Sequence, residues 1–239
     1  AILWYMSNSR DGAFDEQIGS GKTLDAVDLI VAKLRAGCDV ITNIDLDFSM
    51  RKKPFKGSLT HVDIPQLQRV DAVKQWAISH RREKYATWIV IDEAQVVFDA
   101  RFWDDDGRAD WNIFFSQHRK YNSNVILITQ SAENLDKRIR ANVEILRKHT
   151  NIANASKLTR TLSLFLGHKL FIANDFYAGY SRGNNIGSHW ILARRSLTRY
   201  YNTFQILDDV SEEKKEEKLN EEVKSAVDRK ITYRRPSIR

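Results

Sequence analysis

A short glycine-containing run near the start of the chain, Ile18-Gly19-Ser20-Gly21-Lys22-Thr23, has the residue types needed to bind phosphate. Its two glycines let the backbone fold tightly around an anion, while a lysine reaches the β- and γ-phosphates and a threonine hydroxyl binds Mg²⁺. The pattern is the second half of a phosphate-binding loop (Walker A). The predicted phosphate-binding residues are Gly19, Ser20, Gly21, Lys22, Thr23 and Leu24.

One position departs from the full motif. A complete Walker A loop has a glycine five positions before Gly21, and this chain has Glu16 there. The segment 7–17 is also longer than the usual passage from a first strand into the loop. Either it is an insertion over the nucleotide, or the run Ala1–Met6 is not the first strand.

A second run supplies the acidic half of such a site. Thr87–Ile91 is apolar and rich in β-branched residues, as expected of a buried parallel strand, and Asp92 and Glu93 follow it directly. We predict that Asp92 holds Mg²⁺ together with Thr23, and that Glu93 polarises an attacking water. The combination favours a nucleotide site over an ordinary Gly-Ser turn before a helix.

Further polar candidates follow another apolar run. Ser123–Thr129 reads as a buried strand, and Gln130 at its end is placed to sense the γ-phosphate or to orient water. Ring-forming ATPases also place an arginine against the γ-phosphate. The arginines considered for this role are Arg101, Arg119, Arg138 and Arg140.

Composition is that of a folded protein. The 239 residues are 42% hydrophobic and 29% charged, with three prolines and ten glycines, which fits one main α/β domain with additions. The formal net charge of +7 is compatible with a polyanionic partner but does not establish one. The single cysteine, Cys38, excludes an intrachain disulfide and a cysteine-cage metal site. No run has the length of a membrane-spanning helix, so we expect a soluble, cytoplasmic chain.

The elements that must position these residues can be read from periodicity. We expect helices over 23–36, 70–83 and 111–119 and within 131–140, and strands over 1–6, 39–43, 87–91, 123–130 and 143–147. The stripe of Trp111, Phe114 and Phe115 is assigned to the core.

The remaining chain has a different texture. Alternating, aromatic-rich segments over 162–166, 169–176 and 189–193 predict antiparallel strands added to the sheet, and His168 and His189 are given structural roles. Residues 211–230 alternate acidic and basic pairs, which predicts an exposed charged helix before a basic tail. We therefore expect a P-loop ATPase domain over 1–207, an α/β fold with a mainly parallel central sheet flanked by helices. A charged helix with a basic tail is expected over 208–239.

Taken together, several of these segments resemble the cytoplasmic domain of the Zot family, which includes zonula occludens toxin-like proteins and the gene I assembly ATPases of filamentous phages. The resemblance covers most of 2–206. It rests on the segments Ile18–Leu24, Ala36–Cys38 with Thr42–Leu46, Asp92-Glu93, Arg101–Trp103, His118–Lys120, Gln130, Asp136–Arg140 and Tyr200–Thr203.

The resemblance implies an ATPase of the FtsK/HerA branch of P-loop NTPases that uses ATP and Mg²⁺. It implies a homo-oligomeric ring, a hexamer, acting on DNA or on a phage assembly complex, at the inner face of the host membrane and with a membrane partner. Arg140 matches the family's spacing from Asp136, so it is the predicted arginine finger, with Lys22, Glu93 and Gln130 as the other catalytic residues.

Three alternatives remain open at this point. A viral genome-packaging ATPase of the same branch would share the chemistry. A nucleotide-binding assembly module with little hydrolysis is kept open by Glu16. A small-molecule kinase is disfavoured, because Asp92-Glu93 supplies a water-activating acid and no arginine-rich lid follows the loop.

Overall fold

A computed structural model describes residues 1–7, 21–98, 105–130, 135–151, 170–178, 185–193, 197 and 199–201. The chain divides into two compact units, Ala1–Tyr201 and Asn202–Arg239. The second unit lies outside the described residues, as do the predicted strand over 162–166, His168 and the predicted charged helix. The boundary between 207 and 208 therefore stays a prediction.

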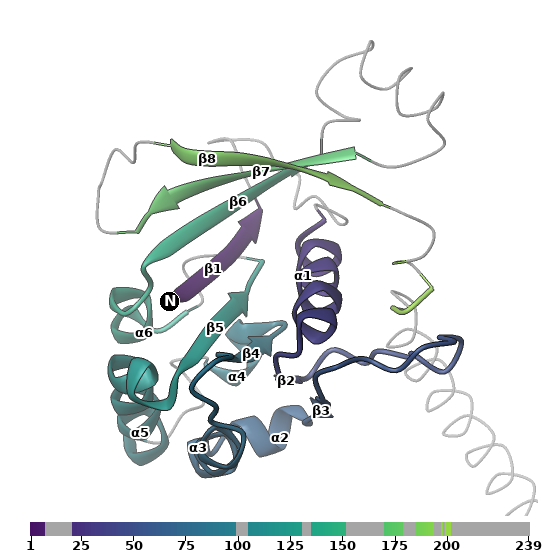
Figure 1. Ribbon diagram of the computed structural model, residues 1–239. Helices are drawn as coiled ribbons and strands as arrows, with labels where there is room; N and C mark the ends of the chain where they lie inside the picture. The colour runs from purple at the N-terminus through teal and green to yellow at the C-terminus, as the bar shows by residue number, and fades with distance from the viewer. Residues whose placement is uncertain are drawn as a thin grey trace, which may run out of the picture. The chain divides into compact units, whose positions relative to one another are not determined.

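The first unit is built on a single sheet with the strand order β3-β2-β4-β5-β1-β6-β7-β8 (Figure 1). The strands from β3 to β6 run parallel, and β7 and β8 are added antiparallel at one side. The strands are β1 (Ile2–Ser7), β2 (Val40–Thr42), β3 (Leu59–His61), β4 (Thr87–Ile91), β5 (Ser123–Ile128), β6 (Ile145–Asn151), β7 (Leu170–Tyr177) and β8 (Asn185–Leu192).

Helices cover both faces of the parallel part, with α1 on one face and the others on the opposite face (Figure 1). The helices are α1 (Lys22–Ala36), α2 (Ile64–Leu67), α3 (Val70–Ser79), α4 (Ala94–Val97), α5 (Asp105–Gln117) and α6 (Lys137–Ala141), with a 3₁₀ turn over His118–Tyr121. This is an α/β fold with a mainly parallel central sheet, as predicted.

The central strands β1, β2, β4 and β5 contribute side chains to two cores, because successive side chains point to opposite faces. Trp4 of β1 packs with α3 and α5, where Trp111, Phe114 and Phe115 are fully buried. The neighbouring Tyr5 faces α1. Burial on both faces explains why these strands appear in the sequence as continuous apolar runs. The core role predicted for the aromatic stripe is confirmed.

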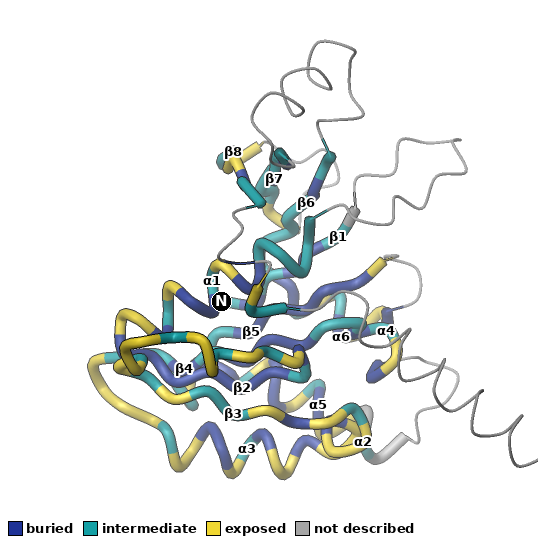
Figure 2. Tube along the Cα trace, turned by 90° about the vertical axis from the view of Figure 1, so that its right-hand side faces the viewer, coloured by how far each residue is buried: buried dark blue, intermediate teal, exposed yellow. Residues whose placement is uncertain are grey.

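Most predicted elements are confirmed, including the first strand and the helix end at Gly37. Residues 8–20 lie outside the described residues, so an insertion over the nucleotide stays a prediction. β1 and β2 flank α1 in sequence but are separated in the sheet by β5 and β4, so they are not direct neighbours. β8 begins at Asn185, four residues before the strand expected over 189–193. Figure 2 shows burial concentrated on the central strands, whereas β8 is largely exposed.

Candidate active site

The described part of the phosphate-binding loop begins at Gly21, directly before α1. Its φ of 87° lies in the left-handed region, which glycine adopts without steric cost. A Cβ at this position would lie 2.7 Å from the Phe171 ring of β7, so both the backbone angle and the available space require glycine. Gly19 and Ser20 lie outside the described residues.

The first turn of α1 carries Lys22, Thr23 and Leu24. The N-terminus of a helix presents unpaired amides and the positive end of the helix dipole, which together favour a bound phosphate. Burial lowers the pKa of Lys22, and the charges of Glu93 and Asp92 oppose this shift. A partly buried ammonium group between carboxylates and a helix N-terminus is well placed to bind phosphate oxygens.

Thr23 is joined directly to the acidic strand end. The Thr23 hydroxyl donates to Asp92 Oδ2 at 3.0 Å, and the Glu93 amide donates to Asp92 Oδ1 at 2.9 Å. Asn43, just after β2, fixes the backbone here: its Nδ2 donates to the Asp92 carbonyl at 2.9 Å and its Oδ1 accepts from the Asp92 amide at 2.7 Å.

These oxygens fit a magnesium ion. Mg²⁺ prefers oxygen ligands in an octahedron with bonds near 2.0–2.1 Å, so neighbouring ligands lie about 3 Å apart. The 3.0 Å between Thr23 Oγ1 and Asp92 Oδ2 matches that spacing. Burial raises the pKa of Asp92 to about 6, opposed by the Glu93 amide and reinforced by the Glu93 carboxylate.

Glu93 has an unusual backbone and two amide partners. Its φ of 49° places it in the left-handed region, which is uncommon for a residue with a side chain and which turns the chain sharply after β4. Gln130 Nε2 donates to Glu93 Oε1 at 2.9 Å, and Gln95 Nε2 donates to Glu93 Oε2. Both carboxylate oxygens are therefore held by side-chain amides.

The structure brings Lys22, Thr23, Asp92, Glu93 and Gln130 together, while Leu24 packs against the small cluster of Phe171, Ala173 and Ile191. Gln130, however, contacts the carboxylate of Glu93, so its position supports a role in orienting that group.

Arg140 is not brought to this site within the chain. α6 lies beside the amino ends of the strands (Figure 1). Two hydrogen bonds connect it to the start of β1: the Val143 amide donates to the Arg140 carbonyl, and the Glu144 amide donates to the Ile2 carbonyl. Arg119 forms an ion pair with Glu144 at 3.0 Å at this same end. Arg101 lies outside the described residues.

Sequence reasoning missed Asn43 and Gln95. The signal for Asn43 was present, because polar residues at the carboxyl ends of adjacent parallel strands meet at one edge, and β2 neighbours β4. Gln95 had no such signal: only the left-handed turn at Glu93 brings its side chain back onto that carboxylate.

The described residues lack two further features. They contain no group of three or more His, Cys, Asp or Glu side chains that could hold a metal ion. Among the same residues, no helix is long and apolar enough to cross a membrane.

The chain is a P-loop NTPase-like protein. Its features of this class are the helix-flanked parallel sheet, the glycine turn before α1 and the Thr23–Asp92 pair. The family model described as zonular occludens toxin (Zot) matches residues 14–162, and the chain belongs to that family. The resemblance noted in the sequence is thereby confirmed.

Individual relatives have low sequence identity to this chain. The gene 1 protein of Enterobacteria phage I2-2 is 28% identical over 207 residues, covering 80% of this chain and 55% of the phage protein. The chain thus spans a little over half of that relative's length. The N-terminal domain of zonular occludens toxin from Neisseria meningitidis is 16% identical with a TM-score of 0.48, covering 84% of this chain and 99% of that one. The genome packaging NTPase B204 from Sulfolobus turreted icosahedral virus 2, in complex with ATP-gammaS, is 11% identical with a TM-score of 0.48. The match covers 77% of this chain and 95% of the B204 chain.

Proposed function

We propose that this chain is the ATP-hydrolysing domain of a Zot-family motor for phage morphogenesis, which converts hydrolysis into virion assembly and extrusion or into movement of DNA. The observation that carries the proposal is the junction of α1 and β4. There the Thr23 hydroxyl lies 3.0 Å from Asp92 at the N-terminus of α1, and Glu93 follows Asp92 directly.

Each residue has one task in the proposed reaction. Gly21 and the first turn of α1 surround the phosphates, and Lys22 neutralises charge on the β- and γ-phosphates. Thr23 and Asp92 would hold Mg²⁺, which supplies charge neutralisation at the phosphate oxygens when bound. Glu93 orients the attacking water and takes up its proton. Gln130 and Gln95 keep the carboxylate of Glu93 in place.

Nucleotide binding and turnover test the proposal at Lys22. Lys22→Ala should weaken binding of MgATP and abolish phosphate release, because the principal cation of the site is removed. Lys52→Ala, an exposed lysine in the loop after β2, is the matched control and should behave as wild type. A wild-type chain that neither binds nor hydrolyses MgATP would overturn the proposed function.

The alternative of an assembly module that binds nucleotide with little hydrolysis keeps one supporting feature, Glu16 in place of the first glycine. The two functions separate in one assay. The module predicts saturable MgATP binding without phosphate release, whereas the motor predicts both. A genome-packaging ATPase of the same branch would show the same chemistry and differ in the polymer that it moves.

A further inference from the structure

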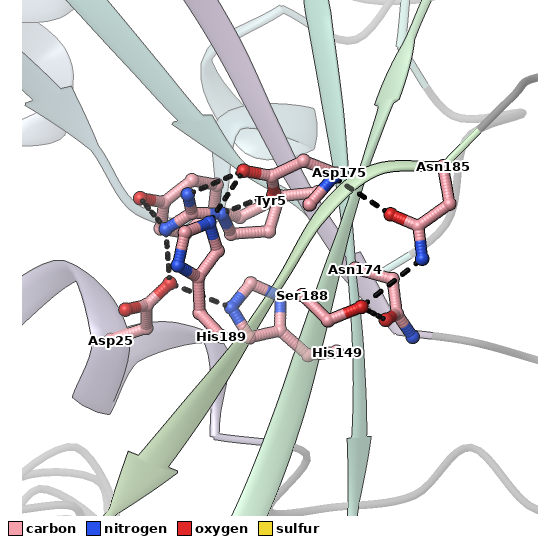
Figure 3. A network of polar contacts seen from close by, with 10 residues as sticks. Tyr5, Asp25, His149, Asn174, Asp175, Asn185, Ser188 and His189 are labelled. Atoms are coloured by element: carbon pink, nitrogen blue, oxygen red, sulfur yellow. Dashed lines mark hydrogen bonds and ion pairs between the residues drawn. The ribbon is translucent and has the colours of Figure 1, made fainter.

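A buried charged cluster lies next to the proposed phosphate site and takes no part in the chemistry assigned above. We call it the Arg147 cluster, and its members are Tyr5, Asp25, Arg147, His149, Asp175 and His189 (Figure 3). Arg147 Nε and the terminal nitrogen Nη2 donate to the two oxygens of Asp175 at 2.6 and 2.7 Å. Its other terminal nitrogen donates to Asp25 at 3.0 Å and to the Tyr5 hydroxyl at 3.1 Å.

The cluster joins four strands to the helix that begins at the phosphate site. Tyr5 lies on β1, Arg147 and His149 on β6, Asp175 on β7 and His189 on β8. Asp25 lies in the first turn of α1, three positions after Lys22 and two after Thr23. A planar guanidinium with donors in fixed directions can hold all of these partners in one geometry, which a lysine cannot do.

Packing at Gly21 supports the same connection. The Phe171 ring of β7 lies 2.7 Å from where a Cβ of Gly21 would be, and Leu24 packs against the cluster that includes Phe171 and Ala173 of the same strand. The antiparallel strand β7 therefore contacts the start of α1 directly, and Arg147 joins β7 to that first turn through Asp175 and Asp25.

The cluster also places negative charge near the proposed phosphate site. Asp25 and Asp175 place two carboxylates close to a site meant for phosphates, and the side chains of Arg147, Asp25 and Asp175 are each only 13% exposed. Arg147 Nη1 donates to Asp25 Oδ2 at 3.0 Å, so the guanidinium offsets the negative charge of this carboxylate. Without Arg147, this carboxylate would repel a bound polyphosphate across one helical turn.

His149 is a second partner of the same Asp25 oxygen. Its Nε2 lies 3.0 Å from Asp25 Oδ2, and its side chain is fully buried. His189 lies 3.1 Å from Asp175 and is half exposed, so it contributes at the surface of the cluster. Arg147 is the cluster's permanently charged member, because arginine stays protonated at any working pH.

We propose that Arg147 is a positioning residue for the proposed nucleotide site. It fixes the first turn of α1 against β6 and β7, and it cancels the charge of Asp25 that would otherwise oppose phosphate binding. The inference rests on the proposed function, since it assigns Arg147 a role in binding MgATP. It assigns no contact between Arg147 and the nucleotide.

Binding of a fluorescent MgATP analogue to the full chain separates charge from geometry. Arg147→Met should weaken affinity about tenfold, because a buried carboxylate near the phosphates is left unpaired. Arg147→Lys keeps the positive charge and loses the planar guanidinium with its fixed donor directions. Its affinity for the MgATP analogue should therefore lie between those of Arg147→Met and wild type. Adding Asp25→Asn to Arg147→Met should recover most of the affinity, whereas adding Asp175→Asn, the matched control farther from α1, should recover less.

Unfolding temperature and binding stoichiometry are measured on the same samples. A merely structural role would lower the unfolding temperature and the fraction of active sites, and would leave the affinity of the folded fraction unchanged; that result would overturn the proposal. Equal recovery by Asp25→Asn and Asp175→Asn would overturn the charge argument. If Arg147→Met does not fold, Arg147→Lys with and without Asp25→Asn carries the same comparison. A wild-type chain that binds no MgATP would instead remove the proposed function itself.

Discussion

At the scale of single residues, Asp92 and Glu93 are neighbours in sequence with different surroundings. Asp92 accepts from the Thr23 hydroxyl and from the Glu93 amide, and its position is fixed by Asn43. Glu93 accepts from two side-chain amides on a backbone with positive φ. The first arrangement suits a metal ligand, and the second suits a group that must keep its orientation while a water approaches. Environment, and not residue type, separates the two proposed roles.

The raised pKa of Asp92 predicts a pH-dependent stability. Burial raises this pKa to about 6 from an ordinary value near 3.9, so between about pH 4 and 6 the folded chain keeps a proton that the unfolded chain releases. Without Mg²⁺ and nucleotide, Asp92 should therefore lower the free energy of unfolding as pH rises through this window. Asparagine does not titrate, so Asp92→Asn should gain stability relative to wild type between about pH 4 and 6, and no more above it.

Urea unfolding in a chelating buffer at several pH values measures this difference. The asparagine amide interacts less favourably than a carboxylate with the Thr23 hydroxyl or the Glu93 amide. That cost is the same at every pH, because asparagine does not titrate. Stability curves of wild type and Asp92→Asn that stay parallel from pH 4 to 7 would show that Asp92 titrates normally.

At the scale of elements, the sequence predicted the features that depend on residues close together in the chain. Continuous apolar runs identified the buried strands β1, β2, β4 and β5, because burial on both faces leaves no polar alternation. Asp92 and Glu93 stand at the end of one of them. The pairing of β5 between β4 and β1 was not predictable, because strand order depends on contacts between distant segments. For the same reason, nothing near Gly21 in sequence indicated that Phe171 packs on it.

That packing makes Gly21 a sensitive position. Gly21→Ala should weaken MgATP binding at least tenfold, because a left-handed alanine costs about 1–2 kcal/mol and its Cβ would also displace the Phe171 ring. Titration with a nucleotide analogue measures the loss. Gly187→Ala in β8 is the matched control, since its Cβ would meet only an ordinary contact at 3.7 Å, and it should bind as wild type. Equal affinities of Gly21→Ala and wild type would show that the loop does not depend on this conformation.

At the scale of the whole molecule, the site is incomplete if an arginine must reach the γ-phosphate. α6 with Arg140 lies by the amino ends of the strands, away from Lys22 and Glu93 (Figure 1). Arg140 can therefore serve as the predicted arginine finger only in a neighbouring subunit. A ring would supply this geometry, because one subunit's amino-end surface can face the next subunit's nucleotide edge.

Mixing experiments test that arrangement. Arg140→Ala alone should bind MgATP and hydrolyse it poorly, and mixing it with inactive Lys22→Ala should restore part of the activity, because some interfaces combine an intact Lys22 with an intact Arg140. Phosphate release measured across mixing ratios gives the result. Full activity of Arg140→Ala would remove the role, and absence of rescue in rings shown to exchange subunits would argue against action between subunits.

The most direct test of the central claim is the turnover of Glu93→Gln beside its binding of MgATP. Glutamine keeps the shape of the side chain but cannot take up a proton, so turnover should fall by about 10²–10⁴-fold while affinity stays close to wild type. Glu83→Gln, at an exposed glutamate before β4, should change neither quantity. Turnover of Glu93→Gln at the wild-type rate would contradict the assignment of Glu93 as the residue that activates water.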